Sequence, residues 1–115
     1  MKTNIYLIFL IQFFFCNSIF TQKPNKEYEF SNLLIKATGE KISGDLSYAD
    51  SIYDKCLEII PNSAIVHFEK SGIYSSENKI NKAIYYAEIA VDLSPKNEWY
   101  LANLALLYKE NKNYK

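Results

Sequence analysis

Residues 82–95 read KAIYYAEIAVDLSP, and residues 48–61, which lie 34 positions earlier, read YADSIYDKCLEIIP. The two segments align without a gap, so that Ala49 falls on Ala83 and both segments end in proline. Their aligned apolar and small residues follow at steps of four, three, one and two residues, which keeps them on one helical face. Proline then ends each helix, because it lacks an amide hydrogen and clashes with the preceding turn. The sequence therefore predicts two amphipathic helices that are copies of one 34-residue unit.

A further helix is predicted after each proline. Residues 98–108, which follow Pro95, read EWYLANLALLY. This pattern resembles the first helix of the tetratricopeptide repeat, a 34-residue unit in which a large residue, Leu, a small residue and an aromatic recur at fixed spacings. The matching positions are Leu33, Lys36, Ala37 and Glu40 in the first repeat, His67, Lys70, Ser71 and Tyr74 in the second, and Leu101, Leu104, Ala105 and Tyr108 in the third. Glu40 departs from the family pattern by replacing the aromatic, and Lys70 by replacing an apolar residue.

The resemblance implies an all-α fold: a right-handed α-solenoid of antiparallel helix pairs, with about two and a half repeats after a signal peptide. The expected organisation is a signal peptide over 1–21, a linker over 22–29, repeat 1 over 30–63, repeat 2 over 64–97, and the first helix of an incomplete repeat 3 over 98–115. Each repeat buries its apolar face only against its neighbours. We therefore interpret the sequence as a fragment of a longer protein, or as a chain whose last helix is covered by a partner.

Small and turn-forming residues have predicted packing roles in this scheme. Small residues on both kinds of helix let paired helices approach closely, and two tyrosines fill the space between neighbouring helices. The small residues are Ala37, Ser71 and Ala105 on first helices and Ala49, Ala83 and Ala90 on second helices, and the tyrosines are Tyr74 and Tyr108. Gly44 is predicted to end a helix in the left-handed conformation, and Asp45 to cap the next helix. Asn78 takes the place of the glycine in the second repeat.

The N-terminal leader has the order of a signal peptide. One lysine precedes an apolar run over residues 5–15, and small and polar residues follow it, with cleavage expected after Thr21. The apolar run is shorter than the roughly 20 residues that a membrane-spanning helix needs. Extending the run to Phe20 leaves an uncleaved anchor open, and a lipid anchor on Cys16 is disfavoured by the phenylalanines before it. The mature protein is therefore expected to be exported, either periplasmic or secreted, with Cys56 as a lone buried thiol.

The overall composition resembles that of exported proteins from Bacteroidetes-type bacteria, because Asn, Lys, Ile and Tyr are abundant and the leader ends in Thr-Gln. The formal net charge is zero and no arginine is present, so the chain lacks the basic face that nucleic-acid binding requires.

The sequence lacks a recognisable catalytic constellation. His67 is the one histidine of the chain and has no second ligand at metal-binding spacing, so we interpret it as a partly buried packing residue. The carboxylate pairs Glu27/Glu29 and Asp50/Asp54 are interpreted as solvated charge on exposed helix faces. We therefore expect no enzymatic activity, no cofactor and no metal site.

The resemblance to the tetratricopeptide family also implies a binding groove lined by first helices. The matching residues, called the predicted groove residues below, are Ser31, Leu34, Thr38 and Lys41 in repeat 1, Ile65, Phe68, Gly72 and Ser75 in repeat 2, and Trp99, Ala102, Leu106 and Lys109 in repeat 3. Such grooves bind extended or helical peptides through apolar pockets and a few polar contacts. Phe68 and Trp99 are the expected anchors, since aromatic residues dominate interface energetics. The alternative for Trp99 is that it packs inside the stack or under the missing part of the repeat array.

Two functions of different classes follow from the sequence. The first is a protein–protein interaction scaffold that binds a peptide or partner protein in the cell envelope or outside the cell. The second is the sensor region of a larger membrane signalling protein, attached to the membrane through an uncleaved leader or a segment beyond Lys115. Binding to acidic chaperone tails is not expected, because the set of Lys, Asn and Arg residues that the family uses for it is reduced to Asn103.

Overall fold

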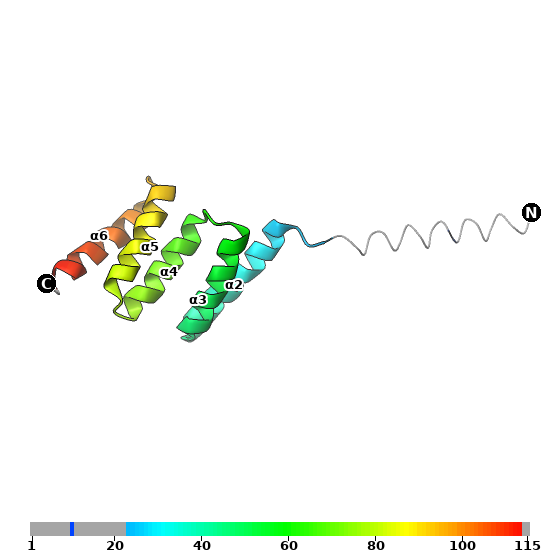
Figure 1. Ribbon diagram of the computed structural model, residues 1–115, viewed down its shortest axis with the longest axis horizontal. Helices are drawn as coiled ribbons and strands as arrows, with labels where there is room; N and C mark the ends of the chain where they lie inside the picture. The colour runs from blue at the N-terminus through cyan, green and yellow to red at the C-terminus, as the bar shows by residue number, and fades with distance from the viewer. Residues whose placement is uncertain (1–9, 11–22, 114–115) are drawn as a thin grey trace, which may run out of the picture.

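The computed structural model describes Leu10 and residues 23–113, and residues 23–113 form helices and turns without a strand. The helices are α2 (Lys26–Ser43), α3 (Leu46–Ile59), α4 (Ala64–Ser76), α5 (Ile80–Leu93) and α6 (Glu98–Asn113). They follow one another in chain order, as Figure 1 shows, and the most extensive contacts join α2 to α3 and α4 to α5. The prediction of an all-α chain is confirmed for this part of the sequence. Except for Leu10, the predicted signal peptide lies outside the described residues.

No helix within the described residues has the length and apolar character needed to cross a membrane.

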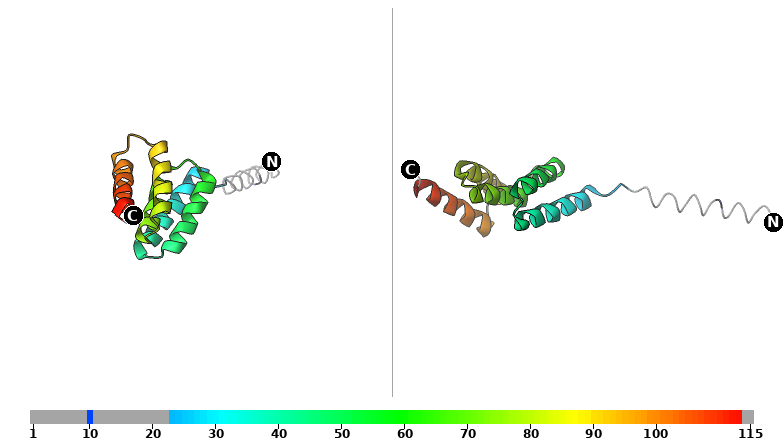
Figure 2. Two further views of the ribbon diagram at one scale, coloured as in Figure 1. Left: turned by 60° about the vertical axis from the view of Figure 1, so that its left-hand side comes forward. Right: turned by 90° about the horizontal axis from the view of Figure 1, so that it is seen from below.

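The helix boundaries repeat with the period that the sequence predicts. A shift of 34 residues carries α3 onto α5, since it moves the first residue from 46 to 80 and the last from 59 to 93. The same shift carries the first residue of α4, Ala64, onto the first residue of α6, Glu98. In Figure 2 (right), α2 and α6 lie along one side of the row, and α3 and α5 lie along the other.

The turns between paired helices take the predicted conformations. Gly44 has φ 97°, and its amide donates to the carbonyls of Glu40 and Lys41 at the end of α2. The Asp45 carboxylate then accepts from the backbone amide of Tyr48 at 3.1 Å and caps α3. In the second repeat, Asn78 has φ 59°, which asparagine tolerates better than most residues other than glycine. The roles predicted for these turn residues are therefore confirmed.

Helix α2 begins earlier than the repeat pattern suggests. It starts at Lys26, inside the segment 22–29 that the sequence assigns to a linker. The cause is local: the Asn25 side chain accepts a hydrogen bond from the amide of Glu27, and Glu27 and Glu29 favourably face the positive end of the helix dipole. Both glutamates are exposed, as predicted.

The small residues of the paired helices are buried in the core. Two clusters form the core. The first contains Ala37, Ala49, Ile52, Tyr53, Cys56, Val66 and Ile73. The second contains Tyr74, Ala83, Ile84, Ala87 and Leu107. Ala37, Ala49, Ser71, Ala83 and Ala90 are all 0% exposed, which agrees with their predicted role. Cys56 is a buried thiol without a disulfide partner among the described residues, and burial raises its pKa.

Two of the packing predictions are wrong for α6. Ala105 is exposed, and Tyr108 is 41% exposed with its hydroxyl donating to Glu88 of α5. Helix α6 instead buries Tyr100 and Leu107. The residues 34 positions earlier on α4, Ser71 and Tyr74, are buried, and Tyr74 stacks on Tyr86 of the following helix. No described residue forms a helix after α6.

Candidate functional site

The N-terminal turn of α6 holds Trp99 on the surface. The Asn97 side chain accepts hydrogen bonds from the amides of Trp99 (3.0 Å) and Tyr100 (3.3 Å), which fixes the start of the helix. Trp99 is 80% exposed and Leu106 is 60% exposed. They are seven residues apart, which is nearly two helical turns and about 10 Å along one side of the helix. Ala102 lies between them and is also exposed. In this structure Trp99 therefore does not pack inside the stack.

Phe68, the other predicted anchor, is partly engaged within the chain. It is half-buried on α4, and its ring centroid lies 4.9 Å from that of Tyr100 on α6. Offset aromatic pairs at this distance are favourable beyond the area they bury. Phe68 therefore connects α4 to α6 in addition to presenting part of its surface to solvent. Ile65, one turn earlier on α4, is 37% exposed.

A polar cluster joins α2 to α4 at the predicted groove residues Thr38 and Lys41. The Lys41 ammonium contacts the Glu69 carboxylate at 2.7 Å, and the Tyr53 hydroxyl donates to the same carboxylate oxygen at 3.4 Å. Burial raises the pKa of Tyr53 to about 12, although a hydrogen bond with Thr38 acts in the opposite direction. A β-carbon at Gly72 would lie 3.3 Å from the Lys41 ammonium, so the absence of a side chain there leaves room for the ion pair.

The other predicted groove residues remain apart from these contacts. Ser31 is exposed and donates its hydroxyl to the Glu27 carbonyl of its own helix. Leu34 packs against the first core cluster, Ser75 is half-buried and Lys109 is exposed. Of the predicted groove residues, the structure thus brings Thr38, Lys41 and Gly72 together around one ion pair. Trp99, Ala102 and Leu106 form a separate apolar strip on α6.

Sequence reasoning missed a buried ion cluster around Lys70. Its side chain is 1% exposed, and its ammonium lies 2.6 Å from one carboxylate oxygen each of Asp50 and Asp54 on α3. Asp50 also accepts a 2.7 Å hydrogen bond from the Tyr74 hydroxyl, and the Tyr86 ring centroid lies 5.1 Å from the ammonium. The prediction of solvated charge is therefore wrong for Asp50, because α4 supplies a cation. The sequence feature that could have predicted the cluster was Lys70 itself, since it replaces an apolar residue of the tetratricopeptide pattern.

The charge state of Lys70 follows from this environment. Burial disfavours the ammonium ion, but hydrogen bonds and charge attraction from Asp50 and Asp54 more than offset it, so the pKa of Lys70 lies above its ordinary value. Burial and the hydrogen bond to Asp50 raise the pKa of Tyr74. Lys70 is therefore a fixed positive charge that holds α3 and α4 together, and it has no character of a catalytic base.

His67 lies beside this cluster and packs as predicted. Its ring is stacked on Tyr86 with a centroid distance of 6.0 Å, and its Nε2 lies 3.0 Å from the carbonyl oxygen of Pro61. A carbonyl oxygen can only accept, so Nε2–H is the donor in this contact. Nδ1 is buried and has no hydrogen-bond partner among the described residues.

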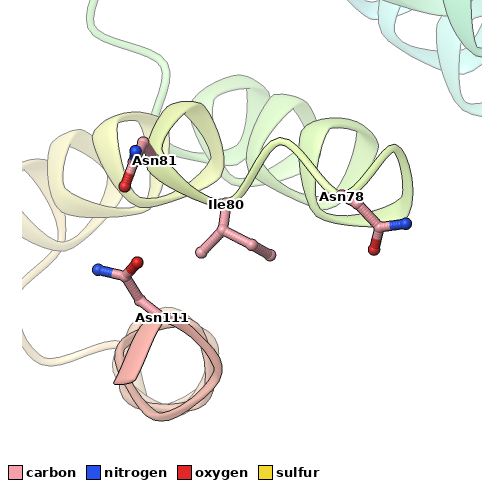
Figure 3. Close-up of a pocket in the computed structure, with 4 residues that line it drawn as sticks. All are labelled: Asn78, Ile80, Asn81 and Asn111. Atoms are coloured by element: carbon pink, nitrogen blue, oxygen red, sulfur yellow. The ribbon is translucent and has the colours of Figure 1, made fainter. Parts of the chain in front are cut away.

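A pocket of about 420 Å³ opens where the start of α5 faces the end of α6, and none of the predicted groove residues lines it. Its lining consists of Asn78, Ile80, Asn81 and Asn111. In Figure 3, Ile80 points into the space between the asparagines of the two helices. Amide and alkyl groups offer hydrogen bonds and apolar contact, but no group that titrates or attacks a substrate. The pocket therefore has no chemistry of its own for catalysis.

Comparison of the chain with protein-family models and with curated proteins finds no match.

Proposed function

We propose that this chain is a tetratricopeptide-type solenoid that binds a segment of another protein along α2, α4 and α6. The 34-residue repetition of helix boundaries supports the repeat architecture. The observation that carries the binding function is the exposure of the apolar strip Trp99, Ala102 and Leu106, with Trp99 at 80%. An exposed indole leaves a large apolar area in contact with water in a monomer, and tryptophan is a frequent centre of protein interfaces.

The neighbouring surface gives the ligand a definite chemistry. Apolar side chains of the ligand would lie on Trp99 and Leu106, and Ile65 would extend that contact onto α4. The Lys41–Glu69 ion pair lies toward α2 and is already neutralised, so it offers no net charge to the ligand. The ligand is therefore an amphipathic or extended segment whose affinity comes mainly from apolar side chains and depends weakly on salt.

The test uses a display library of random peptides selected against the purified chain. The chain has one tryptophan, so the fluorescence of Trp99 reports directly on its own burial when a selected peptide binds. We expect a blue shift, and we expect Trp99→Ala to weaken binding by at least tenfold, since truncation of an aromatic interface anchor costs about 2 kcal/mol or more.

The matched control is Tyr85→Ala, which removes a 58% exposed aromatic from α5. This variant should bind the selected peptides with unchanged affinity. The proposed face would be excluded by peptides that bind Trp99→Ala and Tyr85→Ala as tightly as the parent chain and leave the Trp99 fluorescence of the parent chain unshifted.

A further inference from the structure

Helix α6 carries a second exposed apolar face, distinct from the strip that contains Trp99. It consists of Leu101, Ala105 and Tyr108 and is called the outer face of α6; Leu101 is 42% and Tyr108 is 41% exposed. The residues 34 positions earlier on α4 are His67, Ser71 and Tyr74, and all three are buried. The fold thus contains the same face twice, covered on α4 and open on α6.

The helix that covers this face on α4 shows what kind of surface fits it. Tyr86 of α5 stacks on Tyr74 with ring centroids 5.4 Å apart, and α5 places the fully buried Ala83 and Ala90 at the contact between the helices. The occupant is therefore an antiparallel helix with a small residue at the closest approach and larger side chains on both sides of it.

The outer face of α6 has these properties itself. Glu98, Ala105 and Lys112 lie seven residues apart in sequence, and Leu101 and Tyr108 follow the first two by three residues. This is the a/d spacing of a helix pair, with a small residue in the middle and opposite charges at the two ends. Glu98 and Lys112 are both exposed, and neither forms an ion pair with another described residue.

We propose that the outer face of α6 binds the same face of a second copy of this chain as an antiparallel helix pair. When two α6 helices are centred on Ala105, each Glu98 lies opposite Lys112 of the other copy, whereas a parallel pair would place like charges together. Leu101 and Tyr108 then fill the space on either side of the two alanines. The contact is isologous, which closes the assembly as a two-fold dimer.

Sedimentation equilibrium of the purified chain tests the dimer. Glu98→Lys and Lys112→Glu should each weaken association by about tenfold, since two ion pairs per dimer are lost and replaced by repulsion. The double variant, Glu98→Lys with Lys112→Glu, restores opposite charges across the two-fold axis and should recover dimerisation. The helix dipole disfavours both substitutions, so a gain in the stability of α6 does not explain such a recovery.

Two further variants locate the contact. Ala105→Lys places a charge at the two-fold axis on a position that is exposed within one chain, so it should abolish the dimer without loss of helicity by circular dichroism. Ile35→Lys removes a 71% exposed isoleucine from α2 and should leave the dimer intact. The proposal is overturned by a monomeric parent chain, by association that ignores the charge exchange, or by a dimer that Ile35→Lys dissolves and Ala105→Lys does not.

Discussion

Lys70 joins the two helix pairs through an ion cluster. Burying an ion pair in place of apolar groups adds little stability on average, but removing one member of an existing pair leaves uncompensated charge. Here one ammonium serves two carboxylates, and Asp50 and Asp54 belong to α3 whereas Lys70 belongs to α4. The cluster therefore fixes how α4 lies against α3. Apart from it, α3 and α4 share a limited interface.

Lys70→Met tests this role while preserving most of the side-chain volume. We expect the free energy of unfolding to fall by about 2–4 kcal/mol, less than for a fully buried pair because Asp54 is 60% exposed. Adding Asp50→Asn to Lys70→Met should recover part of the loss, since it removes one of the two unpaired charges. Urea denaturation of the single and double variants measures both effects, and strictly additive losses would contradict the coupling.

The pH dependence of the same variant has a defined sign. The pKa of Lys70 is raised above its ordinary value of 10.5, so its contribution is complete below pH 10.5 and is lost as the pH rises through the higher folded-state pKa. The stability difference between the parent chain and Lys70→Met should therefore be constant at neutral pH and shrink under strongly alkaline conditions. A difference that grows with alkaline pH would contradict the assignment.

At the scale of single elements, substitution of Gly39 and of Gly44 by alanine should change the stability of the chain in opposite directions. Both lie on or next to α2, and an added β-carbon meets nothing within 4 Å at either position. Gly44 has φ 97°, so Gly44→Ala should destabilise the chain by about 1–2 kcal/mol through backbone strain alone. Gly39→Ala lies inside the helix and should stabilise it by about 0.5–1 kcal/mol. Thermal unfolding measures both, and equal effects would mean that the left-handed turn is not maintained.

The elements also show which features of the fold the sequence carries. Helix ends and turns are determined by neighbouring residues in the sequence. Pro61 therefore predicted the end of α3, and Gly44 and Asn78 predicted the two turns. The ion cluster was missed because its carboxylates and ammonium lie 16 and 20 residues apart on different helices. The exposure of Ala105 agrees with the expected incomplete third repeat. The packing role predicted for Ala105 fails because it assumes a covering helix that the described residues do not supply.

The candidate site is predicted less completely than the fold for the same reason. The repeat register identifies which residues share a helix face, and it placed Trp99 and Leu106 on the groove face of the last helix. It left open whether Trp99 is exposed or packed inside the stack. The repeat register does not specify which side chains on other helices each residue contacts. The stacking of Phe68 on Tyr100 and the Lys41–Glu69 ion pair depend on how far apart neighbouring helices lie.

At the scale of the whole molecule, the order of residues in the leader predicts export. The expected cleavage after Thr21 gives a mature protein that begins at Gln22. We expect N-terminal sequencing of the chain, purified from a secreting bacterial host, to show this residue. Thr21→Arg should block cleavage and leave a larger, membrane-associated product. An intact N-terminus in the cytoplasmic fraction of the parent chain would contradict export.

The contact between Phe68 and Tyr100 has a mechanical consequence. It joins the second helix pair to α6, and Asn103 reinforces the same junction by donating to the Ser71 hydroxyl at 3.1 Å. A ligand that inserts a side chain between the two rings must widen this junction and change the pitch of the row of helices. The binding affinity for such a ligand then includes the free energy needed to widen the junction. Tension applied to the ends of the chain would change that free energy and therefore the affinity.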